Sequence, residues 1–400
     1  MFEKVKFAAV AAVLASASPA FAQSNAEAKA KIDECREKHC NSLYLSGIEE
    51  LTSIPQEVLG IPSITELRLS GTGINDLSLL AKLPGLRVLD ISNTPVTDIS
   101  AIATLRVLGR LDLSSTDISD ISALSSLTSL TYLSLRRTQV TDISALANLS
   151  GLTNLNIART NVANLSVLAN FVALTDLDLE QVPAADFSVL AGLPAVTDLD
   201  LTKTSISDLS IIAHMVTLRN LALDDTSISS LSPLAQLYAL RDLKLQRTGV
   251  SDLTPLAELV GLSRLNIDET GVTDLFPIFA LNKLERLSLE DTQVADIFVV
   301  SVLPNLTDLQ LANTQVTEIS ALVKATRLSN LGISNTQISD ISVLANAVSL
   351  SWLDANDSMV SDLGSLLNLE ELRTLYIRNS PAANGAQAAA LEAKGLRVRQ

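Results

Sequence analysis

A 22-residue phrase, LRVLDISNTPVTDISAIATLRV at Leu86–Val107, decides the fold of this chain because it recurs along the sequence. Its pattern LxxLxLxxT begins fifteen times at intervals of 22 residues, first at Ile64 and last at Leu372. When each copy is numbered from offset 0 at its first residue, apolar side chains recur at offsets 0, 3, 5, 10, 13, 16 and 19. A period of fixed length indicates an array in which each unit buries its apolar side against the next.

Each part of the phrase predicts a local structure. Offsets 3 and 5 alternate as in a short strand, and the later spacing of three indicates a 3-10 or short helical turn. Serine at offset 14, such as Ser100, is expected to be the N-cap of that turn, with proline next at the first helical position, as in Pro233. Aspartate at offset 12, such as Asp98, should accept backbone N–H groups, and threonine at offset 8, such as Thr94, should satisfy backbone groups inside the coil.

Composition narrows the possible functions. Hydrophobic residues make up 47% of the 400 residues, which excludes a disordered chain, while aromatic residues make up only 3%. The net charge of −15 disfavours nucleic acid as a partner, because phosphate binding needs a basic surface. Two histidines and two cysteines leave little material for a transition-metal site, and the serines lack a histidine partner for nucleophilic catalysis. We therefore expect a binding or structural protein that is not an enzyme and holds no cofactor.

The first 22 residues have the features of a secretory signal peptide. A basic start at Lys4 and Lys6 precedes an apolar segment, and Ala20-Phe21-Ala22 forms an A-x-A cleavage site. The sequence contains no later apolar run of membrane-spanning length, so we expect an exported chain, periplasmic or secreted. Export makes a disulfide between Cys35 and Cys40 plausible at the end of a helix predicted over Ala26–Cys40.

The repeats resemble those of bacterial leucine-rich-repeat proteins, in particular the internalin type with 22-residue units. The phrases that carry the resemblance include LSLRRTQVTDISALANLSGL and LGISNTQISDISVLANAVSL, at Leu133–Leu152 and Leu331–Leu350. The resemblance implies an α/β fold, a curved right-handed solenoid with a parallel sheet on the concave face and 3-10 or helical turns on the convex face. It also implies protein recognition by that concave face. Threonine stands at offset 8 where asparagine is more familiar in the family.

Four segments are expected along the chain. Residues 1–22 are the signal peptide, 23–63 a helical cap with a short first repeat, 64–381 the repeat array, and 382–400 a second cap. In that second cap, Ala386–Lys394 should form a helix that Gly395 ends, and Leu396–Val398 should add an edge strand. The array should form a single domain.

Offsets 2, 4 and 6 should face outward from the concave sheet, so a binding site would lie in these columns. Neighbouring strands are about 4.8 Å apart, which groups Asp176, Asp178, Asp198 and Asp200 into a square of carboxylates. Three interpretations remain open: a solvated acidic face, a docking patch for a basic partner, or a calcium site. A glycosidase is disfavoured because an open sheet provides no walled pocket in which two carboxyl groups could have different pKa values.

Further candidate residues occupy the same face. Arg136 and Arg159 give its early part positive charge, and Asp242 extends the acidic middle. Trp352 and Tyr376 are expected to form a diagonal pair on neighbouring strands, either as an interface anchor or as incidental packing under the second cap.

The sequence therefore predicts an exported scaffold that binds another protein through its concave face, and the acidic positions favour a partner with a basic surface. We expect a monomer with no membrane span and no nucleic-acid partner. The alternative is a glycan- or calcium-binding protein of the cell envelope or surface.

Overall fold

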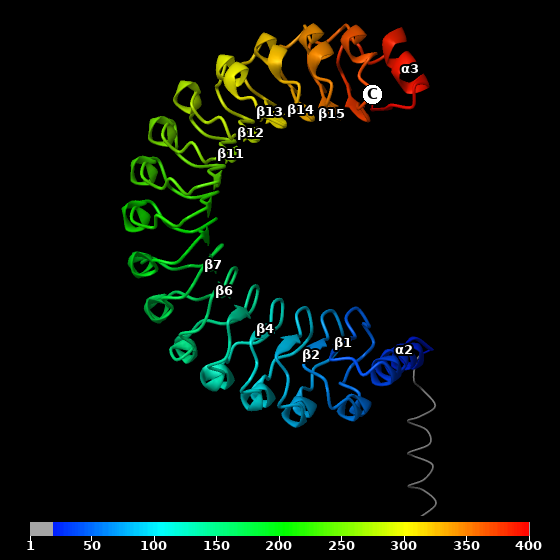
Figure 1. The fold of residues 1–400 in the computed structure, drawn as a ribbon, viewed down its shortest axis with the longest axis vertical. Helices are drawn as coiled ribbons and strands as arrows, with labels where there is room; N and C mark the ends of the chain where they lie inside the picture. Colours follow the sequence, from blue (N-terminus) through cyan, green and yellow to red (C-terminus); the bar gives the residue numbers. More distant parts are fainter. Residues whose placement is uncertain (1–18, 400) are drawn as a thin grey trace, which may run out of the picture. The chain divides into compact units, whose positions relative to one another are not determined.

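A computed structural model describes residues 19–399 of the chain (Figure 1). The chain divides into two compact units, Met1–Leu193 and Pro194–Gln400, which are described separately. In both units each 22-residue repeat forms one coil, in which a strand of three residues is followed by a turn and, except in the last repeat, a 3-10 helix. Within each unit the strands line the inner side of the arc and the 3-10 helices its outer side (Figure 1).

The first unit starts with helix α2 (Pro19–Glu37) and continues as a parallel sheet. The central leucines of its strands are in register, as in Leu43↔Leu67 and Leu67↔Leu89. The strands are β1 Ser42–Tyr44, β2 Glu66–Arg68, β3 Val88–Asp90, β4 Arg110–Asp112, β5 Tyr132–Ser134, β6 Asn154–Asn156 and β7 Asp176–Asp178. The 3-10 helices are η1 Gln56–Gly60, η2 Ser78–Lys82, η3 Ser100–Thr104, η4 Ser122–Ser126, η5 Ser144–Leu146, η6 Ser166–Asn170 and η7 Ser188–Gly192.

The second unit repeats this arrangement and ends in helix α3 (Ala386–Ala393) and a last strand. Its parallel strands are β8 Asp198–Asp200, β9 Asn220–Ala222, β10 Asp242–Lys244, β11 Arg264–Asn266, β12 Arg286–Ser288, β13 Asp308–Gln310, β14 Asn330–Gly332, β15 Trp352–Asp354, β16 Thr374–Tyr376 and β17 Arg397–Arg399. Its 3-10 helices are η8 Ser210–Ile212, η9 Ser232–Leu234, η10 Thr254–Leu256, η11 Phe276–Ile278, η12 Phe298–Val302, η13 Ser320–Lys324, η14 Ser342–Asn346 and η15 Gly364–Leu366.

The core of each unit consists of the predicted apolar columns. In the copy quoted above, Leu86, Leu89, Ile91, Val96 and Ile102 are all 0% exposed. A thin interior of this kind is filled by branched aliphatic side chains, which stack from coil to coil without the space that rings need. The parallel sheet and the 3-10 turns predicted from the sequence are confirmed in both units.

The serine N-cap predicted at offset 14 is wrong. Ser100 is the first residue of η3, and the residue before it forms no capping bond with its side chain. Asp98 does the capping instead, because its Oδ1 accepts the backbone N–H of Ser100 at 2.8 Å. This confirms the role predicted for the aspartate of offset 12, which lies two residues before the group it accepts. Proline is also one position later than predicted, since Pro233 is the second residue of η9.

A residue with left-handed backbone ends the strand segment of each coil, a feature that the sequence analysis did not predict. The residue at offset 7 has a φ near +55° regardless of its type, as at Arg137, Arg159 and Lys203. The next residue, threonine, then folds inward, and the Thr138 hydroxyl donates to the Leu135 carbonyl at 2.7 Å. The threonine column thus satisfies carbonyl groups of its own coil, three residues back in the chain.

Both ends of the described chain carry extra elements. Helix α2 begins earlier than predicted and ends at Glu37, and a disulfide joins Cys35 to Cys40 with 5.0 Å between the Cα atoms. Helix α3 ends before Gly395, whose φ of +89° is left-handed, and β17 pairs with β16 one residue later than predicted. The basic and apolar parts of the expected signal peptide lie outside the described residues. Within residues 19–399, no helix combines the length and apolar character needed to cross a bilayer.

Candidate functional site

The inner face of each sheet presents two side chains per strand, most of them half-buried or exposed. They flank the buried central leucine, as Asp176 and Asp178 flank Leu177 in β7. Because the strands are parallel and in register, equivalent positions form columns with a spacing of about 4.8 Å. Each side chain of a column therefore lies next to the equivalent residue of the next coil, which is 22 positions away in the sequence.

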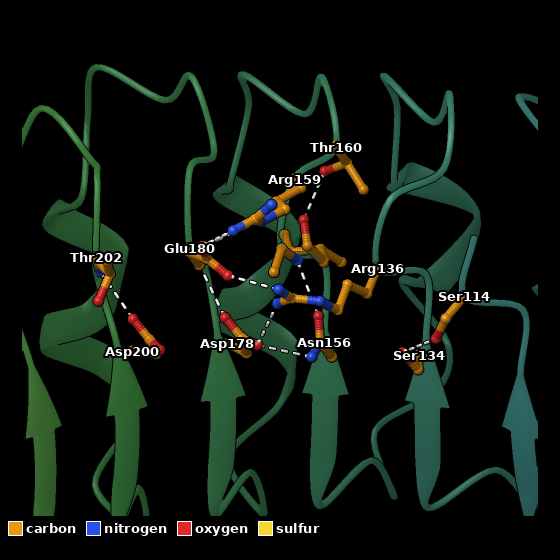
Figure 2. Close-up of polar contacts among 12 residues, drawn as sticks. Ser114, Ser134, Arg136, Asn156, Arg159, Thr160, Asp178, Glu180, Asp200 and Thr202 are labelled. Atoms are coloured by element: carbon orange, nitrogen blue, oxygen red, sulfur yellow. Dashed lines mark hydrogen bonds and ion pairs between the residues drawn. The ribbon is translucent and has the colours of Figure 1, made fainter. Parts of the chain in front are cut away.

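A cluster of two arginines and two acids occupies the inner face of the first unit (Figure 2). Arg136 contacts Glu180 at 2.8 Å and Asp178 at 3.4 Å, and Arg159 contacts Glu180 at 2.6 Å. Asn156 donates to Asp178 at 2.7 Å. The structure thus brings together three of the predicted site residues, Arg136, Arg159 and Asp178, and adds Glu180 and Asn156 to them.

A small residue makes this arginine–acid cluster possible. Arg136, Ala158 and Glu180 share offset 6 in three successive coils. Because the side chain of Ala158 is only a methyl group, the guanidinium of Arg136 has room to extend to Glu180 in the second coil along. The hydrogen bond from Arg159, followed by the bond and charge of Arg136, holds the pKa of Glu180 below its usual value. The carboxylates of this cluster are therefore largely neutralised by arginines of the same unit.

The four aspartates of the predicted square belong to different units, so their square remains a prediction. In the first unit, Asp176 accepts the Thr175 hydroxyl at 2.6 Å. In the second, Asp198 accepts the Thr197 hydroxyl at 2.6 Å and a hydrogen bond from the Asn220 amide. Asp200 accepts the backbone N–H of Thr202 at 2.8 Å (Figure 2). Each of these carboxylates already orders a neighbouring polar group in its own unit. Across residues 19–399, no group of three or more histidine, cysteine or acidic side chains is placed to hold a metal ion.

The inner face of the second unit contains a hollow that the sequence analysis missed. It measures about 400 Å³ and is formed over strands β10 to β13. Its charged lining consists of Lys244, Arg264 and Arg286 with Asp242 and Asp308. The signal in the sequence was a pair of consecutive arginines at offset 2, in an array whose other concave positions are mostly acidic or neutral. Of the predicted site residues, Asp242 lies here, and it pairs with Arg264 at 3.1 Å.

Several acids on the inner face of the second unit are partly or fully buried. Burial raises the pKa of Asp224, Asp268, Glu290 and Asp354 above their usual values. Asp268 is only 7% exposed, and one of its oxygens accepts the Ser288 hydroxyl at 2.6 Å and the Glu290 N–H at 2.8 Å. Asp268 thus organises the turn that follows the strand of the next coil.

The predicted aromatic pair is present in the second unit. The ring centroids of Trp352 and Tyr376 are 5.9 Å apart on the neighbouring strands β15 and β16, within the range of a favourable ring contact. Both side chains are half-buried on the inner face. Their use as an interface anchor remains a prediction.

A second group of aromatic residues lies on the outer side of the second unit. Phe276, Phe279 and Phe298 are 70%, 42% and 63% exposed, and the first two rings are 5.8 Å apart. Phe276 and Phe298 stand at offset 14, where other repeats have mostly serine, and this substitution was the signal that could have revealed them. Exposed rings are unusual because they leave apolar surface in contact with water.

Comparison with known proteins agrees with this architecture. A family model described as Leucine Rich repeats (2 copies) matches residues 62–104, 110–148 and 304–346. A search of curated proteins finds no significant match. The class that the fold and these matches define is a leucine-rich-repeat solenoid.

Several solved structures of bacterial and plant proteins are similar to this chain over most of its length. An internalin, InlF, from Listeria monocytogenes is 27% identical, with 88% of this chain and 94% of that chain covered and a TM-score of 0.55. A leucine-rich-repeat protein of Leptospira interrogans is 17% identical, with 92% and 98% covered and a TM-score of 0.71. The ectodomain of the receptor kinase GASSHO1/SCHENGEN3 from Arabidopsis thaliana, solved in complex with Casparian strip integrity factor 2, is 19% identical, with 86% and 47% covered and a TM-score of 0.59.

Proposed function

We propose that this chain is an exported, non-enzymatic scaffold that binds another protein through the concave face of its repeats. The observation that carries the proposal is the ordered inner face, where charged side chains such as Arg136 and Glu180 are held in place by neighbouring coils. A surface whose side chains are already ordered loses less conformational entropy on binding than a flexible one. The plant receptor ectodomain supports the proposal as an example of this fold in complex with another molecule.

The proposed organisation of the chain follows the sequence analysis. Residues 1–22 are removed on export, 23–63 cap the array, 64–381 form the repeats and 382–400 form the second cap. Mass spectrometry of protein recovered from the cell envelope and the medium tests this, with a chain that starts at Gln23 as the expected result. Recovery of the intact chain from the cytoplasm would contradict export. Light scattering of the purified chain tests the expected monomer.

The partner is proposed to contact the acidic positions of the inner face, which include Asp176, Asp178, Asp198, Asp200 and Asp242. The aromatic pair of Trp352 and Tyr376 is proposed as a second contact, since such rings often anchor interfaces. A basic surface on the partner would suit these acids. Trp352→Ala should then reduce capture of the partner, and unchanged capture would remove the anchor role.

A cross-linking pull-down with the purified chain tests the scaffold itself. The concave variant replaces Asp176, Asp178, Asp198 and Asp200 by asparagine. The matched control replaces four exposed acids outside the strands, Glu49, Glu50, Glu258 and Glu370, by glutamine, and so makes the same change in net charge. We expect the concave variant to lose its partner while the control keeps it. Equal capture by both variants would argue against the acidic positions as the binding surface.

A further inference from the structure

The hollow over β10–β13 has an unusual row of charges. At offset 2 the pairing of these strands places Asp242, Arg264, Arg286 and Asp308 side by side, so two cations lie between two acids. Four such charges could pair one to one, and each arginine would then be neutralised by the acid next to it. Arg264 does so with Asp242 at 3.1 Å.

Arg286 does not form the corresponding pair. Asp308 is turned toward its own strand and the next one, because its Oδ1 accepts the Gln310 amide at 2.7 Å and its Oδ2 accepts the Asn330 amide at 3.3 Å. Within residues 19–399, the guanidinium of Arg286 therefore has no carboxylate within 4.0 Å. This exposed side chain keeps the full set of donors that a guanidinium offers to a planar anion.

A second cation without a carboxylate at contact distance lines the same hollow. Lys244 is exposed at offset 4 of β10, and it forms no ion pair with the acids that the structure describes. The neutral polar side chains of Asn266 and Ser288 continue the lining at offset 4 of the next two strands. A hollow of about 400 Å³ lies within the size range of ligand sites and is larger than a single carboxylate needs.

We infer that this hollow receives a carboxylate side chain of an acidic peptide segment in the partner protein, with Arg286 as its main contact and Lys244 and Arg264 around it. An Arg–carboxylate contact can be bidentate and is stronger than a neutral hydrogen bond. The acids Asp242 and Asp308 on either side repel extended polyanions, so the charge pattern favours an acidic group flanked by basic ones. The inference rests on the proposed function, which it deepens by stating the chemistry of one contact.

Two synthetic peptides test the inference against the purified chain. Fluorescein-labelled Gly-Lys-Glu-Glu-Lys-Gly carries the expected acidic centre, and Gly-Lys-Gln-Gln-Lys-Gly is its neutralised counterpart. The general field of an acidic protein favours the second peptide, which is more positive. The hollow favours the first. We expect the glutamate peptide to bind at least about tenfold more tightly in fluorescence polarisation, since a charged hydrogen bond contributes about that factor.

Variants assign the binding to the hollow. Arg286→Gln should reduce affinity for the glutamate peptide about tenfold or more. The affinity of Arg286→Lys should lie between those of the wild type and Arg286→Gln, because lysine keeps the charge without the planar guanidinium. Arg327→Gln is the matched control, since this exposed arginine lies outside the hollow and bonds to Asn305 at 2.6 Å. Equal binding of the two peptides, or an Arg286→Gln variant that binds as well as the wild type, would overturn the inference. Glutarate that competes as strongly as the peptide would overturn the peptide assignment in favour of a small dicarboxylate.

The same variants separate this inference from the proposed function. If Arg286→Gln leaves both peptide binding and capture of the partner unchanged while the concave aspartate variant loses the partner, the scaffold stands and the carboxylate site falls. If Arg286→Gln lowers both peptide binding and capture while the concave aspartate variant keeps the partner, the carboxylate site stands and protein binding through the acidic positions falls.

Discussion

At the scale of single residues, threonine at offset 8 shows how a repeated side chain can serve the backbone. The Thr138 side chain is 2% exposed, and its hydroxyl supplies a hydrogen bond to the Leu135 carbonyl at the start of the turn. A carbonyl group that leaves water on folding must find such a donor. The column of threonines is therefore a structural feature and contributes nothing to chemistry on the concave face.

Thr138→Val should destabilise the chain by about 1–3 kcal/mol, because it removes the donor of a buried hydrogen bond without changing the side-chain shape. Urea denaturation measures the change. Thr131→Val is the control and should change the free energy of unfolding by no more than about 0.5 kcal/mol. The Gly109 carbonyl that accepts the Thr131 hydroxyl also receives the backbone N–H of Thr131 at 2.9 Å. Equal losses in the two variants would contradict this role.

Asp268 illustrates the opposite case, a residue whose charged form is disfavoured by folding. Burial raises its pKa, so the charged form is less favourable in the folded chain than in the unfolded one. The penalty is present when the carboxyl group is charged, and it decreases as the pH falls from the raised folded pKa toward the unfolded value of 3.8. The residue nevertheless orders Ser288 and Glu290 in the neighbouring coil.

Asp268→Asn should therefore raise the melting temperature at pH 7, because an amide oxygen can accept the same two hydrogen bonds without a charge. The gain should shrink as the pH is lowered toward 4. Melting curves from pH 4 to pH 7 test this, with Asp117→Asn as the control, an exposed acid in another repeat. A gain of the same size at every pH would exclude protonation of Asp268 as the cause.

At the scale of elements, most of the 3-10 helices depend on a side-chain acceptor that lies two residues before their first residue in the chain. The Asp142 carboxylate accepts the Ser144 N–H at 2.8 Å and the Ser144 hydroxyl at 2.9 Å. Asn164 takes the same position in a neighbouring repeat and accepts the Ser166 N–H at 2.9 Å. The geometry thus requires an oxygen at this position and does not require a charge.

Asp142→Ala should lower the melting temperature. Asp142→Asn should lower it much less, because the amide oxygen can still accept the Ser144 N–H. The backbone hydrogen bond, followed by the hydroxyl of Ser144, lowers the pKa of Asp142, so the charged form favours the folded chain. Its contribution is present above pH 3.8 and is lost as the pH falls through the lower folded pKa. The asparagine variant should lack this part of the acid sensitivity. An alanine variant as stable as the wild type would contradict the capping role.

The first cap depends on a short covalent loop. The Cys35–Cys40 disulfide closes the end of α2, which packs against β1 and η1. The replacement of both cysteines by serine should destabilise this cap by about 2 kcal/mol, as loop entropy predicts for so short a loop. Hydrogen exchange in α2 and β1 is the measurement. Reductant should increase exchange in the wild type and leave the double variant unchanged.

At the scale of the whole molecule, contacts within each unit run between successive coils. Such an array has no single long-range core, and its stability is close to a sum of coils and their interfaces. A coil can then be removed if the register of the others is kept, because β3 and β5 present equivalent edges.

Deletion of Leu108–Ser129, one complete repeat, should leave a folded chain with an unchanged circular dichroism spectrum per residue and a slightly smaller denaturant m-value. Deletion of half a repeat, residues 108–118, should unfold the adjoining coils because it moves apolar offsets to the surface. Equal tolerance of the two deletions would show that the 22-residue register does not determine the positions of the coils.

The repeats were predictable from the sequence because their period, apolar columns and turn residues are all local features. For the same reason, the sequence predicted that Asp98 accepts a backbone N–H and that Thr94 satisfies a backbone group of its coil, and both bonds are present. The capping serine was assigned wrongly because Ser100 and Asp98 are both good caps by residue type, and only backbone geometry separates them. The left-handed residue was missed because arginine, lysine and asparagine all occupy it, so no residue type marks the conformation.

What the sequence alone determined is therefore the coil: its length, its buried side chains and the atoms that satisfy its turns. The tertiary structure decided how polar side chains of different coils pair. Arg136 reaches Glu180 past the small Ala158, and Arg286 is left without an acid because Asp308 bonds to Gln310 and Asn330. The physical reason is that a long side chain chooses among rotamers according to the space and charge that neighbouring coils present, and those neighbours lie 22 or 44 positions away.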